Sequence, residues 1–322
     1  MILILSTPRD YDTQLVIDWL SFNDTPFYRL NDEDIMTGHV SFNMNPKNIQ
    51  QAYIKDKNNK ILFKDIKVVW FRKFGFFKSY EGTLGKNNDI TRYIYSEFSI
   101  IRNHIVKLLK DKDWLFKRSN MLTKIEILSM ASQYGLNIPD SIITSEKKEL
   151  NRFFEKHHSS IITKSINEGK HIEHLSKTYA FYTHKITSLK NVQGKFSPSL
   201  FQEYIEKEYE LRIFFLDNKF YPMVIYSQNN EKTKIDFRNY DFENPNRVGC
   251  YKLPVHIEKK LLTLMNTIGL NTGSIDMIKS TNGKYYFLEI NPSGQFGMTG
   301  LPCNYNLHQK VAQYLTNKLN EK

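Results

Sequence analysis

Two acidic side chains and one amide near the C-terminus are spaced so that they could hold a metal ion. They are Asp276, Glu289 and Asn291. Between the two acids, Asn282-Gly283 separates two runs rich in β-forming residues, which predicts a hairpin with a two-residue type I′ turn. In that register Asp276 lies directly opposite Glu289, and Asn291 follows on the same face.

Carboxylates that face each other across a hairpin repel unless a positive charge lies between them. Carboxylate and amide oxygens suit Mg²⁺, which commonly takes its remaining ligands from water and nucleotide phosphates. Pro292 ends the second strand where a ligand would project from the rim of the sheet. We expect residues 293–297 to form a flexible turn that can approach a ligand closely. The alternative is a surface hairpin whose acids point into solvent.

Three cations lie in segments that could direct them at an anion. Lys164 interrupts an apolar strand-like run, Arg212 shares a strand face with Glu210, and Arg238 stands in a later polar segment. An ammonium or guanidinium on a rigid element can bind a phosphate or a carboxylate. The simpler alternatives are an exposed strand end for Lys164 and a structural ion pair between Glu210 and Arg212.

The elements that would position these residues form two groups. The first 118 residues predict an α/β unit, with strands at residues 2–5, 27–30 and 68–71 and helices at 12–20 and 93–109. A helix follows that ends at Gly135, which would form its C-cap, and Pro139 lies just beyond this end. Beyond it we expect strands at residues 160–165, 200–205, 209–216 and 219–226, a helix at 256–268 and the hairpin. This order predicts α/β followed by α+β with antiparallel strands.

The composition excludes several classes of protein. With 322 residues, 40% of them hydrophobic, the chain can bury a sizeable core and is not a disordered tail. Polar residues interrupt every apolar run before the roughly 18 residues that a membrane span needs. The first run lacks a preceding basic region, so it predicts a buried strand and not a signal peptide. Cys250 and Cys303 lack the spacing of a zinc or redox motif, so we expect two buried thiols in a cytoplasmic protein.

The charge balance is basic, with 45 Lys and Arg against 34 Asp and Glu. Residues 101–200 hold 17 basic and 9 acidic residues, without one dense cluster. This excess suits an acidic peptide as well as a phosphate backbone, so a nucleic-acid-binding module is an alternative. The opposed acids of the hairpin argue against it, because a site for a polyanion would not collect carboxylates.

The order of these residues resembles that of the ATP-grasp carboxylate ligases. The shared series is Lys124 in the helix that ends Gly-Leu-Asn-Ile-Pro, Lys164, Gln202-Glu203-Tyr204-Ile205, Glu210-x-Arg212, Asp236-Phe237-Arg238, Asp276 and Glu289-x-Asn291. A narrower resemblance is to the graspetide synthetases, the peptide-modifying ligases of microviridin and grasp-with-spasm systems. It rests on Val69-Trp70-Phe71-Arg72-Lys73, Ser227-Gln228, Asp236-Phe237-Arg238-Asn239-Tyr240 and Phe287-Leu288-Glu289-Ile290-Asn291-Pro292-Ser293-Gly294-Gln295.

The resemblance implies an ATP-grasp fold, α/β and α+β, in three parts. Residues 1–118 would be an N-terminal α/β domain of the pre-ATP-grasp kind, and residues 119–200 a central lid subdomain. Residues 201–322 would be a C-terminal antiparallel-sheet subdomain with the hinge and the metal site. Recognition of a leader peptide is expected at residues 171–198. The phosphate loop at residues 165–170 departs from the family, because it holds one glycine.

The resemblance also implies ATP and Mg²⁺ as cofactors, with two ions expected. Phosphate-binding roles fall to Lys124 and Lys164, the adenine hinge to Gln202, Glu203, Tyr204 and Ile205, and ribose contact to Glu210. Metal-binding roles fall to Asp276, Glu289 and Asn291. The catalytic residues would be Arg212 and Arg238, which would position phosphate or the substrate carboxylate.

As a graspetide synthetase, the protein would phosphorylate Glu or Asp side chains of a ribosomal precursor peptide. Thr or Ser hydroxyls would then attack to form ester crosslinks, or Lys would attack to form amides. The alternatives are an ATP-grasp ligase that acts on an amino acid or small metabolite, and a degenerate ATP-binding regulator. The resemblance also suggests a homodimer.

Overall fold

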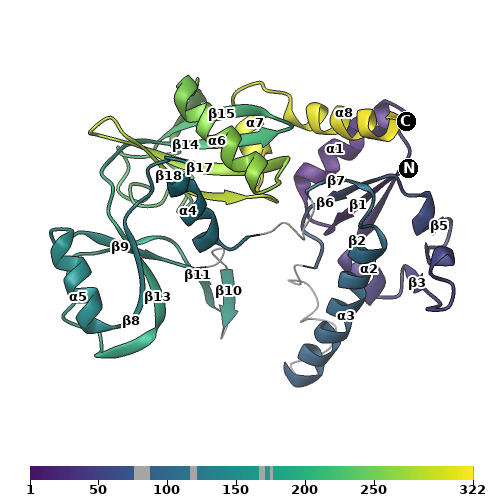
Figure 1. Cartoon of the computed structure of the whole chain (residues 1–322), viewed down its shortest axis with the longest axis horizontal. Helices are drawn as coiled ribbons and strands as arrows, with labels where there is room; N and C mark the ends of the chain where they lie inside the picture. Colours follow the sequence, from purple (N-terminus) through teal and green to yellow (C-terminus); the bar gives the residue numbers. More distant parts are fainter. Residues whose placement is uncertain (76–87, 117–121, 167–170, 175–176, 322) are drawn as a thin grey trace. The chain divides into compact units, whose positions relative to one another are not determined.

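The computed structural model describes residues 1–75, 88–116, 122–166, 171–174 and 177–321, and the chain forms two compact units (Figure 1). Unit 1 comprises Met1–Ser119, Ser293–Leu301 and Asn306–Lys322, and unit 2 comprises Asn120–Pro292 and Pro302–Tyr305. Two segments after residue 292 therefore belong to unit 1, whereas the sequence grouped them with the C-terminal subdomain. The predicted boundary at residues 200 and 201 falls inside unit 2, and the three-part division stays a prediction.

The core of unit 1 is a parallel sheet in the order β2-β1-β6-β7. Its strands are β1 (Ile2–Ser6), β2 (Phe27–Asn31), β6 (Val68–Phe71) and β7 (Asp113–Leu115). The apolar runs of β1 and β6 do not alternate with polar residues, and both strands are buried throughout, as is typical of a parallel sheet covered on both faces. The predicted α/β class of this part is confirmed.

Helices and a small sheet complete unit 1. Its main helices are α1 (Tyr11–Phe22), α3 (Asn88–Leu108) and α8 (Leu307–Asn320), and α1 packs against α8. The short helices are α2 (Asp32–Met36), α7 (Gly297–Gly300) and the 3₁₀ turns η1 (Ile49–Gln51) and η2 (Phe63–Asp65). The antiparallel strands β3 (Ser41–Asn43), β4 (Tyr53–Lys55) and β5 (Lys60–Leu62) form the small sheet.

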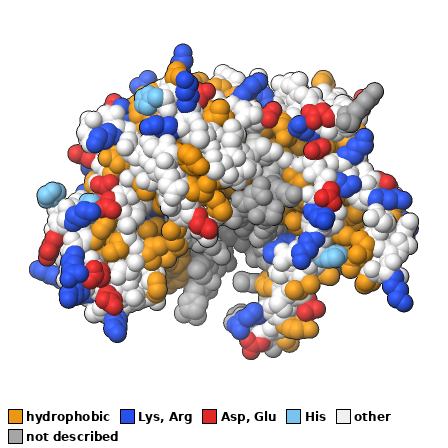
Figure 2. All heavy atoms as spheres, in the orientation of Figure 1, with side chains coloured by type: hydrophobic (Ala, Val, Ile, Leu, Met, Phe, Trp, Pro, Cys, Tyr) orange, Lys and Arg blue, Asp and Glu red, His pale blue; other side chains and the backbone are white. Residues whose placement is uncertain are grey.

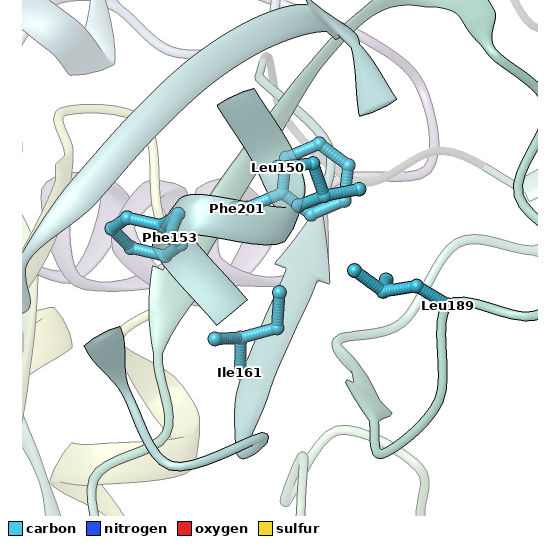
Figure 3. Packing of buried hydrophobic residues seen from close by; sticks show 5 residues of the cluster. All are labelled: Leu150, Phe153, Ile161, Leu189 and Phe201. Carbon is cyan, nitrogen blue, oxygen red and sulfur yellow. The ribbon is translucent and has the colours of Figure 1, made fainter. Parts of the chain in front are cut away.

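The central part of unit 2 is an antiparallel sheet in the order β12-β9-β13-β8. Its strands are β8 (Ser141–Glu146), β9 (Ile161–Lys164), β12 (His184–Ile186) and β13 (Lys195–Glu203). Helix α5 (Lys147–Lys156) follows β8, and β10 (His171–His174) pairs with β11 (Lys177–Ala180). Figure 3 shows the apolar cluster that joins α5 to this sheet, formed by Leu150, Phe153, Ile161, Leu189 and Phe201.

The rest of unit 2 is built on an antiparallel sheet in the order β16-β15-β14-β17-β18. Its strands are β14 (Lys207–Leu216), β15 (Lys219–Tyr226), β16 (Arg247–Cys250), β17 (Thr272–Ser280) and β18 (Tyr285–Asn291). Helix α4 (Lys124–Gln133) packs against β18 and against α6 (Val255–Thr267) (Figure 1). The predicted antiparallel C-terminal sheet is confirmed.

The predicted pairing of Asp276 with Glu289 is present, but the predicted turn is wrong. Gly283 has φ +84°, whereas Asn282 is outside the left-handed region, so this is not a type I′ turn. Ser280 pairs with Lys284 across three turn residues, and the Ser280 hydroxyl holds the turn. The register shifts by one residue at Leu288, and this bulge restores the pairing of the two acids.

Three surface features bear on the class of protein. Cys303 is buried as expected, but Cys250 is exposed because it ends edge strand β16, so that prediction was wrong. On the face shown in Figure 2, Lys and Arg side chains are interspersed with Asp and Glu side chains. No helix in the described part of the chain is long and apolar enough to cross a membrane.

Candidate nucleotide and carboxylate site

A pocket in unit 2 is lined by both apolar and charged side chains. Its apolar side chains include Ile162 of β9, Phe237, Ile278 of β17 and Leu288 of β18. The bulge explains why Leu288 and its neighbour Glu289 both line the pocket, although adjacent strand residues normally point to opposite faces. An apolar lining beside a few convergent charges is typical of small-molecule and cofactor sites.

The charged end of the pocket is built on three neighbouring strands. Arg212 of β14 pairs with Asp276 of β17, which pairs with Glu289 of β18, so the three side chains share one face of the sheet. Arg212 Nη1 donates to both carboxylate oxygens of Asp276 at 2.7 Å. Burial raises the pKa of Asp276; Arg212 opposes the rise and Glu289 adds to it. A second cation near this pair would therefore be strongly favoured.

Glu289 contacts the cations that the sequence assigned to phosphate. Lys124 Nζ lies 2.8 Å from Glu289 Oε2, and Arg238 Nη1 lies 4.0 Å from Oε1. Burial favours a raised pKa for Glu289, but Lys164 and Lys124 overcome it and hold the pKa at about 2. Lys124 is the first residue of α4, and the Thr123 hydroxyl caps that helix by accepting from a backbone N–H.

Arg238 is held by its own loop. Its guanidinium donates to both oxygens of Asp236, at 2.9 and 2.7 Å, and this hydrogen-bonded pair raises the pKa of Arg238 further. Asp236 Oδ2 also accepts from the backbone N–H of Thr183 at 2.9 Å. The side chain of Arg238 remains 37% exposed, so it can bind a further anion without leaving Asp236.

A further ion pair, which sequence reasoning missed, lies in the same pocket. Lys207 Nζ donates to Glu210 Oε1 at 2.8 Å and to the carbonyl of Ile235, and Ser227 Oγ donates to the same Glu210 oxygen. A spacing of three predicts opposite faces of a strand for Lys207 and Glu210. The register of β14 shifts between Lys207 and Tyr209, and this irregularity brings both side chains into the pocket.

Only part of the predicted adenine hinge, residues 202–205, lines the pocket. Glu203, Tyr204 and Ile205 line the pocket, whereas Gln202 is fully buried and donates to Ser141 Oγ at 2.8 Å. The carboxylate of Glu203 accepts from the backbone N–H of Asp140 at 2.9 Å, which fixes the hinge to the start of β8.

The structure thus brings most of the predicted residues together. Eight line the pocket: Lys164, Glu203, Tyr204, Ile205, Glu210, Arg238, Asp276 and Glu289. Lys124 and Arg212 join them through hydrogen-bonded carboxylates. Asn291 ends β18 two residues after Glu289, on the same face but outside the pocket lining. Residues 167–170 of the glycine-poor loop lie outside the described residues.

The donor groups fit a magnesium nucleotide. Arg212 Nε is buried without a hydrogen-bond partner among the described residues, which leaves a donor that a phosphate oxygen could satisfy. No three His, Cys, Asp or Glu side chains converge as a metal cage in the part of the chain that the structure describes. A cation between Asp276 and Glu289 would therefore need ligands from elsewhere, as Mg²⁺ takes them from substrate phosphates.

Comparison with protein families finds one match across most of the chain. The RimK-like ATP-grasp domain matches residues 120–315. A comparison with curated proteins found no match.

Solved structures resemble the whole chain. Macrocyclase MdnC of Microcystis aeruginosa MRC, bound with precursor peptide MdnA, is 27% identical with a TM-score of 0.83, covering 98% of this chain and 100% of that chain. A Chryseobacterium gregarium RiPP-associated ATP-grasp ligase, in complex with ADP and a leader and core peptide, is 25% identical with a TM-score of 0.82, covering 98% and 96%. ATP-grasp ligase PsnB, complexed with a phosphomimetic precursor variant, Mg and ADP, is 14% identical with a TM-score of 0.76, covering 99% and 98%, and shows likeness of fold.

Proposed function

The chain belongs to the RimK-like ATP-grasp family and is an ATP-grasp ligase, and from this premise we propose that it macrocyclises a ribosomally synthesised precursor peptide. Two similar structures carry a precursor peptide or its leader and core, and both cover nearly the whole chain. The observation in this molecule that carries the proposal is the opposed Asp276–Glu289 pair, surrounded by cations in a pocket that also has apolar lining residues.

The reaction has two steps. A carboxylate oxygen of a Glu or Asp side chain attacks the γ-phosphorus of ATP, and ADP leaves. A Thr or Ser hydroxyl of the same peptide then attacks the acyl carbon, loses its proton and expels phosphate, which forms an ester. The balance is loss of one water from the peptide for each ATP converted to ADP and phosphate. Bound Mg²⁺ would neutralise charge on the transferring phosphoryl group.

Within this proposal the chain's own groups bind and orient the reactants. Lys124 and Lys164 bind the phosphates, and Glu210 faces the ribose beside its partner Lys207. Asp276 and Glu289 bind Mg²⁺ with Asn291. Placing the reacting oxygen and phosphorus in contact supplies most of the catalysis, because phosphoryl transfer needs alignment and charge stabilisation more than covalent help.

Arg212 and Arg238 would each bind a different anion, the transferring phosphate or the substrate carboxylate. Arg212 has an unused buried Nε–H, which suits the transferring phosphate. Arg238 is partly exposed and already oriented by Asp236, which suits a carboxylate that arrives with the peptide. Two Mg²⁺ ions, leader recognition at residues 171–198, a homodimer and a cytoplasmic location belong to the same proposal.

The test is to co-express the chain with a short peptide, bearing Thr and Glu, that is encoded beside its gene. Intact mass would show loss of one or more waters with the wild type and no loss with Asp276→Asn. Recovery of the original mass after mild alkaline hydrolysis would identify esters, and resistance to alkali would identify amides. No mass change by an enzyme that binds Mg-ATP would contradict the assignment for that peptide and favour a small-molecule ligase.

A further inference from the structure

The turn between α5 and β9 contacts the predicted adenine hinge. His157 follows the last residue of α5, and His158 and Ser159 adopt left-handed backbone conformations, with φ of +51° and +59°. Two successive non-glycine residues in this region are strained, and such strain persists only where the surrounding structure holds it. The carbonyl of Ser160, which ends the turn, accepts from the backbone N–H of Tyr204 at 3.2 Å. The turn thus holds one backbone group of the hinge directly.

The side chain of His157 reaches the hinge by a second route. Its Nε2 lies 2.8 Å from Asp140 Oδ2, and its Nδ1 lies 3.9 Å from Glu203 Oε2. Burial favours a raised pKa for Asp140, but hydrogen bonds from Lys156 and His157 overcome it and lower the pKa. Asp140 is therefore an ionised acceptor at neutral pH, and His157 Nε2 carries the proton of this hydrogen bond.

Asp140 in turn is bonded to Glu203 at two points. The backbone N–H of Glu203 donates to the carbonyl of Asp140 at 2.9 Å, and the backbone N–H of Asp140 donates to Glu203 Oε1 at 2.9 Å. Glu203 lines the nucleotide pocket, and so does Pro139, the residue before Asp140. A displacement of Asp140 would therefore shift two lining residues of the pocket.

The imidazole of His157 is itself fixed by packing. Its ring centroid lies 4.5 Å from that of Phe153, which belongs to the apolar cluster in Figure 3. The side chain of His157 is 13% exposed, whereas that of Lys156, which also donates to Asp140, is 66% exposed. Exposed ion pairs contribute little, because water screens them. His157 is therefore the partner that can hold the Asp140 carboxylate in one place.

We propose that His157 is a positioning residue that sets the selectivity of the nucleotide pocket for adenine. It holds Asp140, and Asp140 holds the hinge at Glu203. Hydrogen bonds to the edge of a base discriminate between bases only when the protein keeps its donors and acceptors within about 0.5 Å of the productive geometry. The inference rests on the adenine-hinge role expected for residues 202–205 in the proposed function.

The test compares the Kd for ADP with the Kd for inosine diphosphate (IDP), measured by calorimetry on the full chain at saturating Mg²⁺. Both nucleotides have the same ribose and phosphates. Adenine presents an amino donor beside a ring-nitrogen acceptor, and hypoxanthine presents the reverse, so the ratio of the two Kd values reports on the base edge.

His157→Phe keeps a ring against Phe153 and removes the hydrogen bond to Asp140. We expect it to reduce the preference for ADP about fivefold or more, the factor that one ordinary hydrogen bond contributes, through weaker binding of ADP. His157→Gln, whose amide can donate to Asp140, should recover part of the preference.

Lys156→Gln is the matched control, because it removes the exposed partner of the same carboxylate. It should leave the ratio of the two Kd values unchanged. Asp140→Ala removes the acceptor, so it should act like His157→Phe. The double variant should be no worse than either single variant, because both remove one interaction.

The outcomes separate this inference from the assignment on which it rests. If the wild type binds ADP and IDP equally, the adenine-hinge role of residues 202–205 fails, and this inference fails with it. If the wild type prefers ADP and folded His157→Phe keeps that preference, the hinge role stands and the positioning role is overturned. Should His157→Phe not fold, Asp140→Ala decides the question by itself. None of these measurements uses a peptide, so the peptide-mass experiment tests macrocyclisation separately.

Discussion

Two networks of buried opposite charges, one in each unit, differ in how completely the protein satisfies them. In unit 1, the side chains of Arg72 and Asp10 are 3% and 1% exposed. Arg72 donates hydrogen bonds to Asp10 and to a backbone carbonyl, and Asp10 also accepts a hydrogen bond from Lys73. Burial opposes ionisation of Asp10, but Arg72 and Lys73 hold its pKa well below the usual range.

In unit 2, the network around Asp276 and Glu289 is open. Glu289 is 21% exposed and Arg238 is 37% exposed, and Arg212 Nε has no partner among the described residues. These groups carry binding capacity that the protein itself does not use. Charge pairing alone therefore does not identify a site, because a site also needs donors and acceptors left for a ligand.

The largest effect should follow from removing the acid that is central to the open network. We expect Asp276→Asn to lower kcat/KM for the precursor peptide by at least about 100-fold, because the proposed Mg²⁺ site would lose a charged ligand. The rate of ADP release with peptide present is the measurement. An unchanged rate would place the metal elsewhere.

The corresponding change in the unit 1 network around Arg72 and Asp10 should lower the stability of the fold. Asp10→Asn leaves Arg72 and Lys73 without their shared carboxylate, and breaking a buried pair costs about 3–5 kcal/mol. We expect a melting temperature lower by several degrees, measured by thermal scanning. A melting temperature equal to that of the wild type would mean that the two networks do not differ as described.

A moderate effect is expected at the ion pair of Lys207 with Glu210. Burial raises the pKa of Glu210, and Lys207 opposes the rise. Lys207→Met should therefore leave Glu210 protonated or unpaired and weaken ADP binding about tenfold, as expected for a lost buried charged partner. Lys279→Met is the control, because Lys279 lies on the opposite face of the sheet over Tyr285. Equal effects of both variants would refute a specific role for Lys207.

The effect that is smallest near neutral pH, and grows as the pH rises, is a pH dependence of ADP binding. Burial lowers the pKa of Lys164 to about 8, so the free enzyme loses this charge as the pH rises through that value. Bound phosphate favours the charged form, so the Kd for ADP should increase above pH 8, by up to about tenfold per pH unit. Lys164→Arg should flatten the dependence, because arginine stays charged. Titrations between neutral pH and about pH 9.5 would check it, and the same slope in both proteins would contradict it.

The pairing of Asp276 with Glu289 shows how far local rules reach. A two-residue turn with regular alternation predicts the correct pair of facing acids, but two departures from that prediction offset each other. The turn itself has three residues, and the bulge at Leu288 corrects the resulting register. The bulge could not be predicted, because strand periodicity assumes an unbroken ladder and the local residue pattern does not mark where an extra residue is inserted.

Local rules failed at Lys207 for a related reason. Its spacing from Glu210 and its charged neighbours are typical of a solvated strand end. The irregularity in β14 instead places Lys207 in the pocket. Strand periodicity assumes a regular ladder, and sequence alone does not reveal where the ladder is broken.

The sequence by itself determined the types of the helices and strands that it predicted, the antiparallel C-terminal sheet and the order of site residues that resembles the ATP-grasp ligases. Turn chemistry and side-chain periodicity act over a few residues, so a single sequence carries this information. Only the tertiary structure decided which charges meet. Arg72 reaches the carbonyl of Ser293 across 221 residues, and Arg212 keeps an unused donor beside Asp276. Many cations and carboxylates of this chain are interchangeable in sequence, and only folding selects those that come within hydrogen-bond distance and lose their water.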